Sequence, residues 1–290
     1  MEKRILKGRK MVQKILLSFM LVLIPVTLTY ILTPFYIKLQ EEKNYTVSNY
    51  QGKRVATAGG VILWLVLLSV YPLYYFYPGV EPLTLRVMFF YVTGITFLGL
   101  LDDFRGDKKC KGFRGHCKAL WEKRVVTTGL VKAAGGFLLG ASATALAGGG
   151  GWIEWVAKGI FLSLFSNFFN LLDTRPARAA GIFLFFSLVS MLIFRELLFI
   201  LFPLWSALYI YLLQELARRI MLGDTGAYLL GGALGFPLAL RLTMGQIILF
   251  NIAMIILHCY CEKFSLNKFM ESKKLFHFEA LKEEDKSDQC

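Results

Sequence analysis

The sequence predicts an all-α membrane protein, a polytopic bundle of about nine transmembrane helices. Hydrophobic residues make up 56% of the 290 residues, and the mean hydropathy is +0.54. These values are too apolar for an ordinary soluble domain. Apolar segments close to the length of about 17–25 residues that a membrane-spanning helix needs recur along the chain. The longest polar segments, 102–132 and 262–290, are too short to form a separate soluble domain.

Nine apolar segments are the predicted spans. In order, they are 15–37, 55–80, 83–101, 133–153, 155–172, 179–194, 197–214, 225–240 and 242–261. Some are short, but Lys and Arg at their ends extend them by snorkelling. The first segment is long enough to span and lacks a following small-residue cleavage site, so we expect a retained helix. Residues 1–265 are expected to form one integral-membrane domain, and 266–290 a disordered polar tail.

The distribution of basic residues predicts the orientation. The loops after the odd-numbered helices carry 23 of the 33 Lys and Arg, whereas the loops after the even-numbered helices carry four. The positive-inside rule therefore places the odd loops in the cytoplasm. The six basic residues before the first helix disagree, because nine crossings would put them outside, and the orientation of this end stays open. The net charge of +13 fits this topology and contact with anionic lipid, so we expect no nucleic-acid partner.

Four aspartates lie at the ends of apolar segments in these odd loops: Asp102, Asp103, Asp173 and Asp224. A carboxylate at the bilayer centre costs about 2.5–3.5 kcal/mol, so acids near the membrane need a reason. Any one of them alone could simply cap a helix or begin a loop. If the four loops converge on one membrane face, the acids repel one another, and Mg²⁺ with phosphate oxygens would offset that repulsion. Together the acids indicate phosphoryl or phosphosugar transfer to or from a lipid.

Basic residues accompany the acids in the same loops. Lys53, Lys111, Arg175 and Arg178 are the candidate contacts for an anionic substrate. The alternative is that they only set the topology and contact lipid. For Arg175 and Arg178, both interpretations stay open.

Four motifs carry a resemblance to a known family. In order, they are "AGG" at 58–60, "LLDD" at 100–103, "NFFNLLD" at 167–173 and "GDTGAYLLGGALG" at 223–235. In this order and spacing, over about residues 50 to 265, the chain resembles the polyprenyl-phosphate N-acetylhexosamine-1-phosphate transferases. These include the phospho-N-acetylmuramoyl-pentapeptide transferase of peptidoglycan synthesis and the transferases that begin other envelope glycans with GlcNAc-1-phosphate.

The resemblance implies a helical fold, usually of ten crossings, with its site on the cytoplasmic face of the bacterial cell membrane. It implies Mg²⁺, a UDP-linked amino sugar and undecaprenyl phosphate as cofactor and substrates, and a lipid-linked diphosphate sugar and UMP as products. By position, Asp102 and Asp103 match the catalytic acids and Asp224 matches the Mg²⁺ ligand. Asn170 and Asp173 match a polar pair that binds substrate. Direct attack and a covalent step on Asp both stay open, as does a homodimer.

The chain also departs from the family pattern. The loop after the fifth helix usually reads Asn-x-x-Asp-Gly-x-Asp-Gly, but here Pro176 stands at the second acid, which helps to recognise uracil. Met221 stands where an aromatic stacks on the base, and Ala56 replaces a proline. A histidine-rich loop that contacts the sugar and a tenth helix are both missing. The alternatives are therefore an active transferase, a non-catalytic relative that binds polyprenyl phosphate or an assembly partner, and, less favoured, a transporter or channel.

Overall fold

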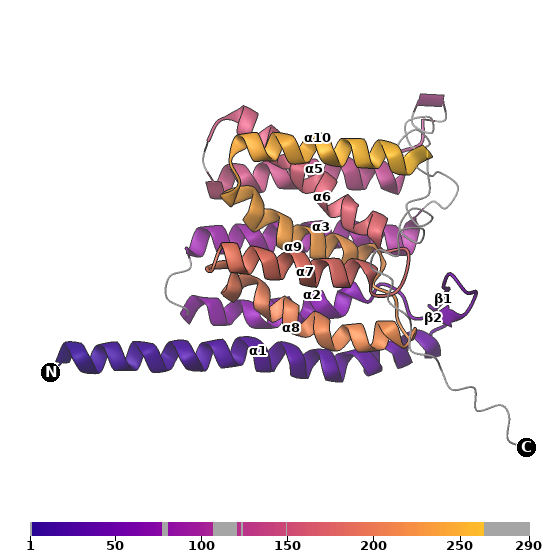
Figure 1. The fold of residues 1–290 in the computed structure, drawn as a ribbon. Helices are drawn as coiled ribbons and strands as arrows, with labels where there is room; N and C mark the ends of the chain where they lie inside the picture. The colour runs from indigo at the N-terminus through magenta and orange to yellow at the C-terminus, as the bar shows by residue number, and fades with distance from the viewer. Residues whose placement is uncertain (1, 77–80, 107–120, 123, 149, 264–290) are drawn as a thin grey trace, which may run out of the picture.

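The structure, a computed structural model, describes residues 2–76, 81–106, 121–122, 124–148 and 150–263 (Figure 1). The α-helices in these ranges are α1 (Glu2–Glu42), α2 (Gly60–Val70), α3 (Pro82–Arg105), α5 (Thr128–Gly148), α6 (Trp152–Leu172), α7 (Arg178–Ile193), α8 (Leu197–Leu216), α9 (Gly223–Arg241) and α10 (Met244–Lys263). A 3-10 helix, η1 (Tyr71–Phe76), extends α2. Two short strands, β1 (Val47–Ser48) and β2 (Arg54–Val55), pair antiparallel after α1.

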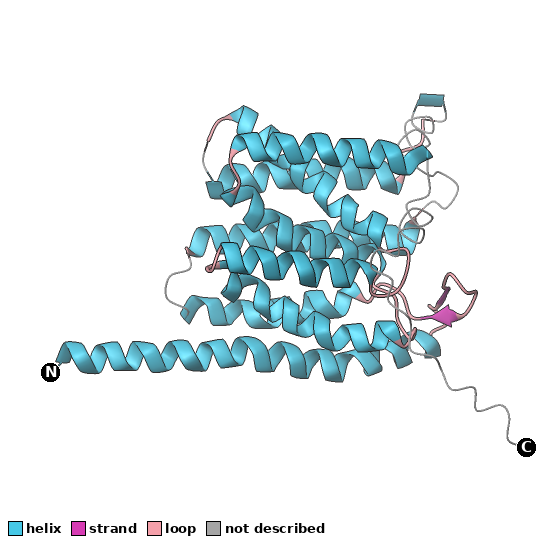
Figure 2. Ribbon diagram, in the orientation of Figure 1, coloured by secondary structure: helices cyan, strands magenta, loops and turns pink. Residues whose placement is uncertain are grey.

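The all-α prediction is confirmed, since the described elements are helices apart from this one hairpin (Figure 2). Each of the nine predicted segments overlaps mainly with one α-helix, but several boundaries were wrong. In 55–80, for example, α2 spans only Gly60–Val70 and the 3-10 helix η1 follows it. The first helix is much longer than 15–37, running from Glu2 to Glu42. The fourth begins at Thr128 instead of 133 and so includes Lys132, which pairs with acids from other helices.

Within the described ranges, six helices are long and apolar enough to cross a membrane, namely α1, α3, α5, α6, α8 and α10. The 60–76 segment and α7 are apolar but shorter, and α9 is not among the six. The chain is thus a membrane protein by the length and composition of its helices. Large apolar side chains on the peripheral helices also face outward, such as Leu249 and Ile256 of α10 at 66% and 64% exposure, as lipid contact requires.

Helix α9 is the centre of the bundle. It packs against α3, α6, α2 and α7, and nearly every residue from Thr225 to Pro237 is buried. A helix enclosed by other helices contacts protein instead of lipid. Small residues favour such close packing, because they let the helix backbones approach one another. The glycines of α9, together with Asp224, lower its hydropathy, so this central helix is less apolar than the six.

Glycines bring three helix ends into direct backbone contact. A Cβ on Gly60 of α2 would lie 2.1 Å from the backbone nitrogen of Gly226, and one on Gly99 of α3 would lie 2.5 Å from the carbonyl oxygen of Asp224. Real Cβ atoms do not approach so closely, so only glycine fits at these two positions. The first turn of α9 is thereby held against both α2 and the last turns of α3.

The loops that carry the sequence motifs meet at one end of the bundle, the end that also carries the hairpin (Figure 1). The segment before α2 runs beside the segment before α9. The Ala56 nitrogen donates to the Arg219 carbonyl at 3.3 Å, the Met221 nitrogen donates to the Ala56 carbonyl at 2.8 Å, and the Gly59 nitrogen donates to the Met221 carbonyl at 3.0 Å. A proline at 56 would lack the first of these donors, so alanine at this position adds a bond between the two loops.

Candidate functional site

Side chains from four helices form a cluster around the first turn of α9. We call Asp102, Asp103, Lys132, Asn170 and Asp224 the acid cluster. The Lys132 ammonium lies 2.6 Å from Asp102 Oδ2 and also contacts Asp224 Oδ2. The Asn170 amide donates to the same Asp224 oxygen at 3.3 Å. Two carboxylates from α3 and α9 therefore converge on one cation.

Asp103 holds the first turn of α9. Its Oδ1 accepts from the Asp224 backbone nitrogen at 3.0 Å, and its Oδ2 accepts from the Thr225 backbone nitrogen at 2.9 Å and from the Thr225 hydroxyl. Backbone N–H groups at a helix start lack partners within the helix and carry partial positive charge, so a carboxylate stabilises them. Asp103 belongs to α3, so this cap joins two helices. Because it binds the backbone nitrogen of Asp224, it holds the backbone from which the Asp224 side chain projects.

Gly223 makes this arrangement sterically feasible. Its φ of +71° is a left-handed conformation, and a Cβ there would lie 2.7 Å from Asp103 Oδ2. A side chain at 223 would be strained and would also displace the capping carboxylate. The glycine before Asp224 is therefore required by the site geometry itself.

Lys132 is the residue of this cluster that the sequence analysis missed. It is 7% exposed, and its ammonium lies 5.1 Å from the centre of the Tyr228 ring, which adds a cation–π contact. The Tyr228 hydroxyl in turn donates to Asn167 Oδ1 at 3.1 Å. The signal in the sequence was a lone lysine inside an apolar helix, a position where a charge needs a partner.

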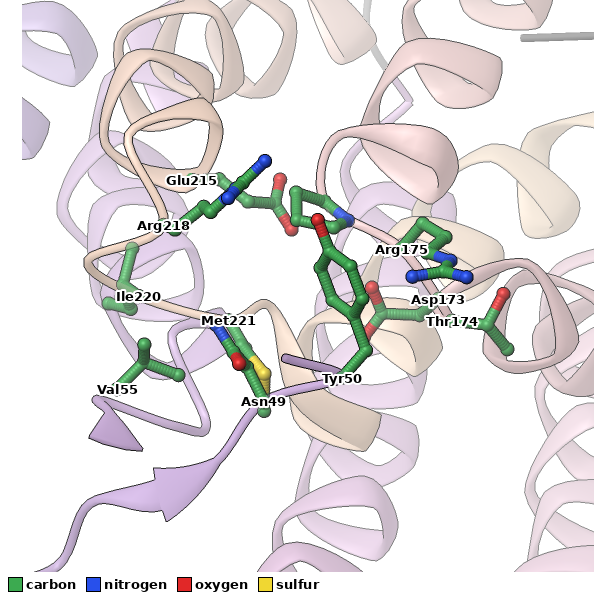
Figure 3. A pocket seen from close by; sticks show the side chains of 11 residues that line it. Asn49, Tyr50, Val55, Asp173, Thr174, Arg175, Glu215, Arg218, Ile220 and Met221 are labelled. Atoms are coloured by element: carbon green, nitrogen blue, oxygen red, sulfur yellow. The ribbon is translucent and has the colours of Figure 1, made fainter. Parts of the chain in front are cut away.

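A cavity of about 80 Å³ lies beside the acid cluster (Figure 3). We call it the Asp173 cavity. It is lined by Asn49, Tyr50, Val55, Asp173, Thr174, Arg175, Pro176, Glu215, Arg218, Ile220 and Met221. These residues come from the hairpin, from the loop between α6 and α7, from the end of α8 and from the loop before α9. Apart from Glu215, its walls are thus loop and hairpin residues.

Tyr50 presents an aromatic ring in this cavity. The Arg175 guanidinium lies 4.2 Å from the centre of the ring and that of Arg218 lies 5.9 Å from it. Arg218 also donates to Gln51 Oε1 at 2.6 Å, which ties it to the hairpin. Met221 lines the same cavity, so the Tyr50 ring of the hairpin and the Met221 side chain of the loop before α9 share one space (Figure 3). Sequence reasoning missed Tyr50 because no motif surrounds it.

Two acids also line the Asp173 cavity. Glu215 is 2% exposed, and among the described residues its Oε2 atom has no hydrogen-bond partner. The Asp173 side chain is only partly exposed at the cavity. The surrounding protein removes water from its carboxyl group, and this desolvation raises the pKa of Asp173 well above the usual value for aspartate. The negative charge of Glu215 adds to this effect, followed by those of Asp224 and Asp103. Asp173 therefore connects the cavity electrostatically to the acid cluster.

The remaining predicted substrate contacts are not all brought to the site. Arg175 lines the Asp173 cavity, whereas Arg178 does not; it is 4% exposed at the start of α7 and donates to Thr174 Oγ1 at 3.0 Å. Lys53 is exposed on the hairpin and is not among the lining residues. Lys111 lies outside the described residues. The structure thus separates Arg175 from Arg178, which the sequence analysis had paired.

The acid cluster presents hard oxygen ligands. In the described ranges, no group of three or more His, Cys, Asp or Glu side chains is arranged to hold a metal ion. Mg²⁺ is commonly bound by only one or two carboxylates together with substrate phosphates and water. Asp102 and Asp224, which already share one cation, fit that smaller requirement, and the Asn170 amide nitrogen holds the Asp224 carboxylate in place.

The sequence matches no known protein-family model and no curated protein sequence. Its function is therefore argued from the chemistry of its residues. That chemistry consists of a two-carboxylate cation site on fixed helix ends, and beside it a small cavity with a ring, two guanidinium groups and two acids.

Proposed function

We propose that this chain is a Mg²⁺-dependent phosphosugar transferase of the polyprenyl-phosphate N-acetylhexosamine-1-phosphate transferase type. It would transfer a phospho-amino-sugar from a UDP-sugar to undecaprenyl phosphate, giving a lipid-linked diphosphate sugar and UMP. The observation that carries the proposal is the convergence of Asp102 and Asp224 on a single cation at the end of an apolar helix bundle. A site at that position is accessible to a lipid phosphate and to a soluble nucleotide.

Asp102 and Asp224 are the residues that would hold Mg²⁺. When bound, the ion would neutralise charge on the transferring phosphoryl group. Lys132 already balances part of the negative charge of the two carboxylates, which lets them approach one another. Asp103 acts as a positioning residue, because both of its oxygens accept hydrogen bonds from the start of α9. The fixed glycine contacts keep the two carboxylates oriented before substrate arrives, so little reorganisation is needed during reaction.

The reaction is a displacement at phosphorus. An oxygen of the lipid phosphate bonds to the phosphorus next to the sugar, the bond from that phosphorus to the bridging oxygen breaks, and UMP leaves with its electron pair. Residues of the chain contribute by positioning and by charge neutralisation. A direct displacement needs no covalent intermediate; a path through a covalent step on Asp stays open beside it.

The Asp173 cavity is the proposed site of the nucleotide. Arg175 and Arg218 suit diphosphate oxygens, because guanidinium groups form charge-assisted hydrogen bonds with phosphate. Tyr50 offers a face on which a base can stack, and base stacking on an aromatic contributes about 1–3 kcal/mol. Glu215 and Asp173 offer acceptors for base or ribose N–H and O–H groups. These contacts would replace those lost at Pro176 and Met221.

The proposed membrane arrangement has nine crossings, with the acid cluster on the cytoplasmic face of a bacterial cell membrane. The uneven distribution of basic residues supports this orientation. A cysteine introduced by Asp107→Cys in a cysteine-free background should be protected from an impermeant maleimide in intact cells and should react after permeabilisation. Labelling from outside would contradict both the topology and the location of the site.

The direct test of the activity uses purified protein with Mg²⁺, undecaprenyl phosphate and a panel of UDP-sugars. UMP release that needs the lipid, the metal and one class of donor is the expected result. The matched control is Asp224→Asn purified in the same way. A protein that binds undecaprenyl phosphate but releases no UMP with any donor would support the second candidate, a non-catalytic polyprenyl-phosphate binder, which the missing histidine-rich loop favours.

A further inference from the structure

A second cavity lies at the opposite end of the bundle, and we call it the far cavity. Glu81 caps the start of α3, whose last turn carries Asp102, and Arg241 ends α9, whose first turn carries Asp224. At about 1.5 Å of rise per residue, the length of α3 between Glu81 and Asp102 is roughly 30 Å. This is about the thickness of the hydrocarbon core. The far cavity, which both Glu81 and Arg241 line, therefore lies about one hydrocarbon-core thickness from the acid cluster.

The walls of the far cavity are apolar and come from three helices. Leu85 and Met88 belong to α3, Ile200 to α8, and Phe236 and Leu240 to α9. The volume is about 400 Å³, compared with about 80 Å³ for the Asp173 cavity. This volume is within the range of about 300–1,000 Å³ of sites that enclose organic ligands. An apolar cavity of this size at this end of the bundle suits a hydrocarbon chain.

The rim of the far cavity carries two charges of each sign. Lys14 and Arg241 are the cations, and Glu81 and Glu196 are the anions. Arg241 contacts Glu196, and both side chains remain about half exposed, at 43% and 48%. Glu81 accepts from the backbone nitrogens of Leu83 and Thr84, which fixes its carboxylate at the rim.

A rim of balanced charge selects among lipid head groups. An anionic head group would satisfy the two cations but would face two carboxylates. A head group with a phosphate and a primary ammonium can satisfy all four charges, because the ammonium donates hydrogen bonds to carboxylates and the phosphate accepts them from Lys and Arg. A trimethylammonium group has the charge but no hydrogen to donate.

We infer that the far cavity binds a phosphatidylethanolamine molecule. One acyl chain occupies the space beside Leu85 and Leu240, the phosphate lies between Arg241 and Lys14, and the ammonium contacts Glu196 and Glu81. The lipid bridges α1, α3, α8 and α9 at the end remote from the acid cluster. This inference is independent of the proposed transferase activity, because none of its residues belongs to the acid cluster or the Asp173 cavity.

The test is native mass spectrometry of delipidated protein with equimolar phosphatidylethanolamine, phosphatidylglycerol and phosphatidylcholine of matched chains. Wild type should retain phosphatidylethanolamine at least about fivefold more than either of the others. Leu240→Trp fills the cavity and should abolish this preference. Leu192→Trp is the matched control, since Leu192 is 71% exposed and does not line the cavity, and it should keep the preference.

Glu196→Gln provides a second variant that does not depend on core packing, because Glu196 is at the surface. It should reduce the preference for phosphatidylethanolamine over phosphatidylcholine while leaving the amount of protein recovered unchanged. Equal retention of the three lipids by wild type, or a preference for phosphatidylglycerol, overturns the inference. If both Leu240→Trp and Glu196→Gln kept the preference for phosphatidylethanolamine, the lipid would not bind in the far cavity.

Discussion

The acid cluster and the Asp173 cavity lie side by side but are built differently. The acid cluster stands on helix ends that glycine contacts and the Asp103 cap hold in one position. The Asp173 cavity is formed mainly by a hairpin and two loops around one helix end. Rigid helices position groups accurately, whereas loops change their side chains and lengths with little effect on the fold. Under the proposed function, the reaction chemistry would depend on the rigid acid cluster and the choice of ligand on the loops of the Asp173 cavity.

The differences from the family pattern follow the same division. The resemblance is strongest at residues of the acid cluster, including Asp102 and Asp224. It fails at Pro176 and Met221, which both line the cavity. Tyr50 and Glu215 reach the same cavity from the hairpin and from α8. Under the proposed function, they would take the places of the aromatic and the acid of the family pattern.

The largest expected effect is on turnover when a carboxylate of the acid cluster is removed. Asp224→Asn should lower UMP release by several orders of magnitude, because a ligand of the proposed Mg²⁺ loses its charge. The control is Glu41→Gln, which removes an exposed carboxylate from the loop end of α1. Equal turnover in wild type and Asp224→Asn, or full wild-type activity in EDTA, would refute the role of the cluster.

A substitution that overpacks the contact between α2 and α9 tests whether this contact stabilises the acid cluster. Gly60→Ala places a Cβ within 2.1 Å of the Gly226 nitrogen, and overpacking of this kind typically costs about 1–3 kcal/mol. We expect a lower midpoint of thermal unfolding in detergent. Gly245→Ala on α10 is the control, because a Cβ there has nothing within 4 Å. If both variants melt at the wild-type temperature, the close approach of α2 and α9 does not stabilise the bundle.

The cavity is tested by nucleotide affinity. Arg175→Ala should weaken UDP binding about tenfold to a hundredfold, as expected for a lost hydrogen bond to a charged group. Arg219→Ala in the neighbouring loop is the control, since Arg219 is exposed and does not line the cavity. Adding Arg178→Ala to Arg175→Ala should weaken binding little further, because Arg178 does not line the cavity and donates to the Thr174 hydroxyl instead. If Arg175→Ala bound UDP as tightly as wild type, the proposal that the nucleotide binds in the Asp173 cavity would be contradicted.

The smallest expected effect concerns pH and Asp173. Its pKa is raised in the folded protein by loss of hydration and by Glu215. The folded state therefore keeps this proton to higher pH than the unfolded state, so this residue destabilises the fold as pH rises above the usual value for aspartate. Asp173→Asn cannot ionise, and its midpoint of unfolding should exceed that of wild type by a margin that grows between pH 5 and pH 8. If the difference between the two midpoints became smaller from pH 5 to pH 8, the pKa of Asp173 would not be raised in the folded protein.

The sequence predicted what depends on local pattern. The helices followed from apolar segments, and Asp102, Asp103 and Asp224 followed from charge at the ends of those segments. Lys132 was missed because its partners are 30 and 92 residues away, a pairing that only packing reveals. Tyr50 and Glu215 were missed for the same reason. The length of α1 was underestimated because its polar ends carry no apolar signal, although they continue the helix.

The central claim is that the acid cluster and the Asp173 cavity act as one site, which calorimetry of UDP binding with and without Mg²⁺ tests most directly. If they share a ligand, Mg²⁺ should raise the affinity of wild type for UDP at least about tenfold, and UDP should raise the affinity for Mg²⁺ by the same factor. The enhancement should disappear in Asp224→Asn, while weak metal-free binding of UDP remains. A wild-type UDP affinity that is the same with and without Mg²⁺ would contradict the claim, as would an enhancement that persists in Asp224→Asn.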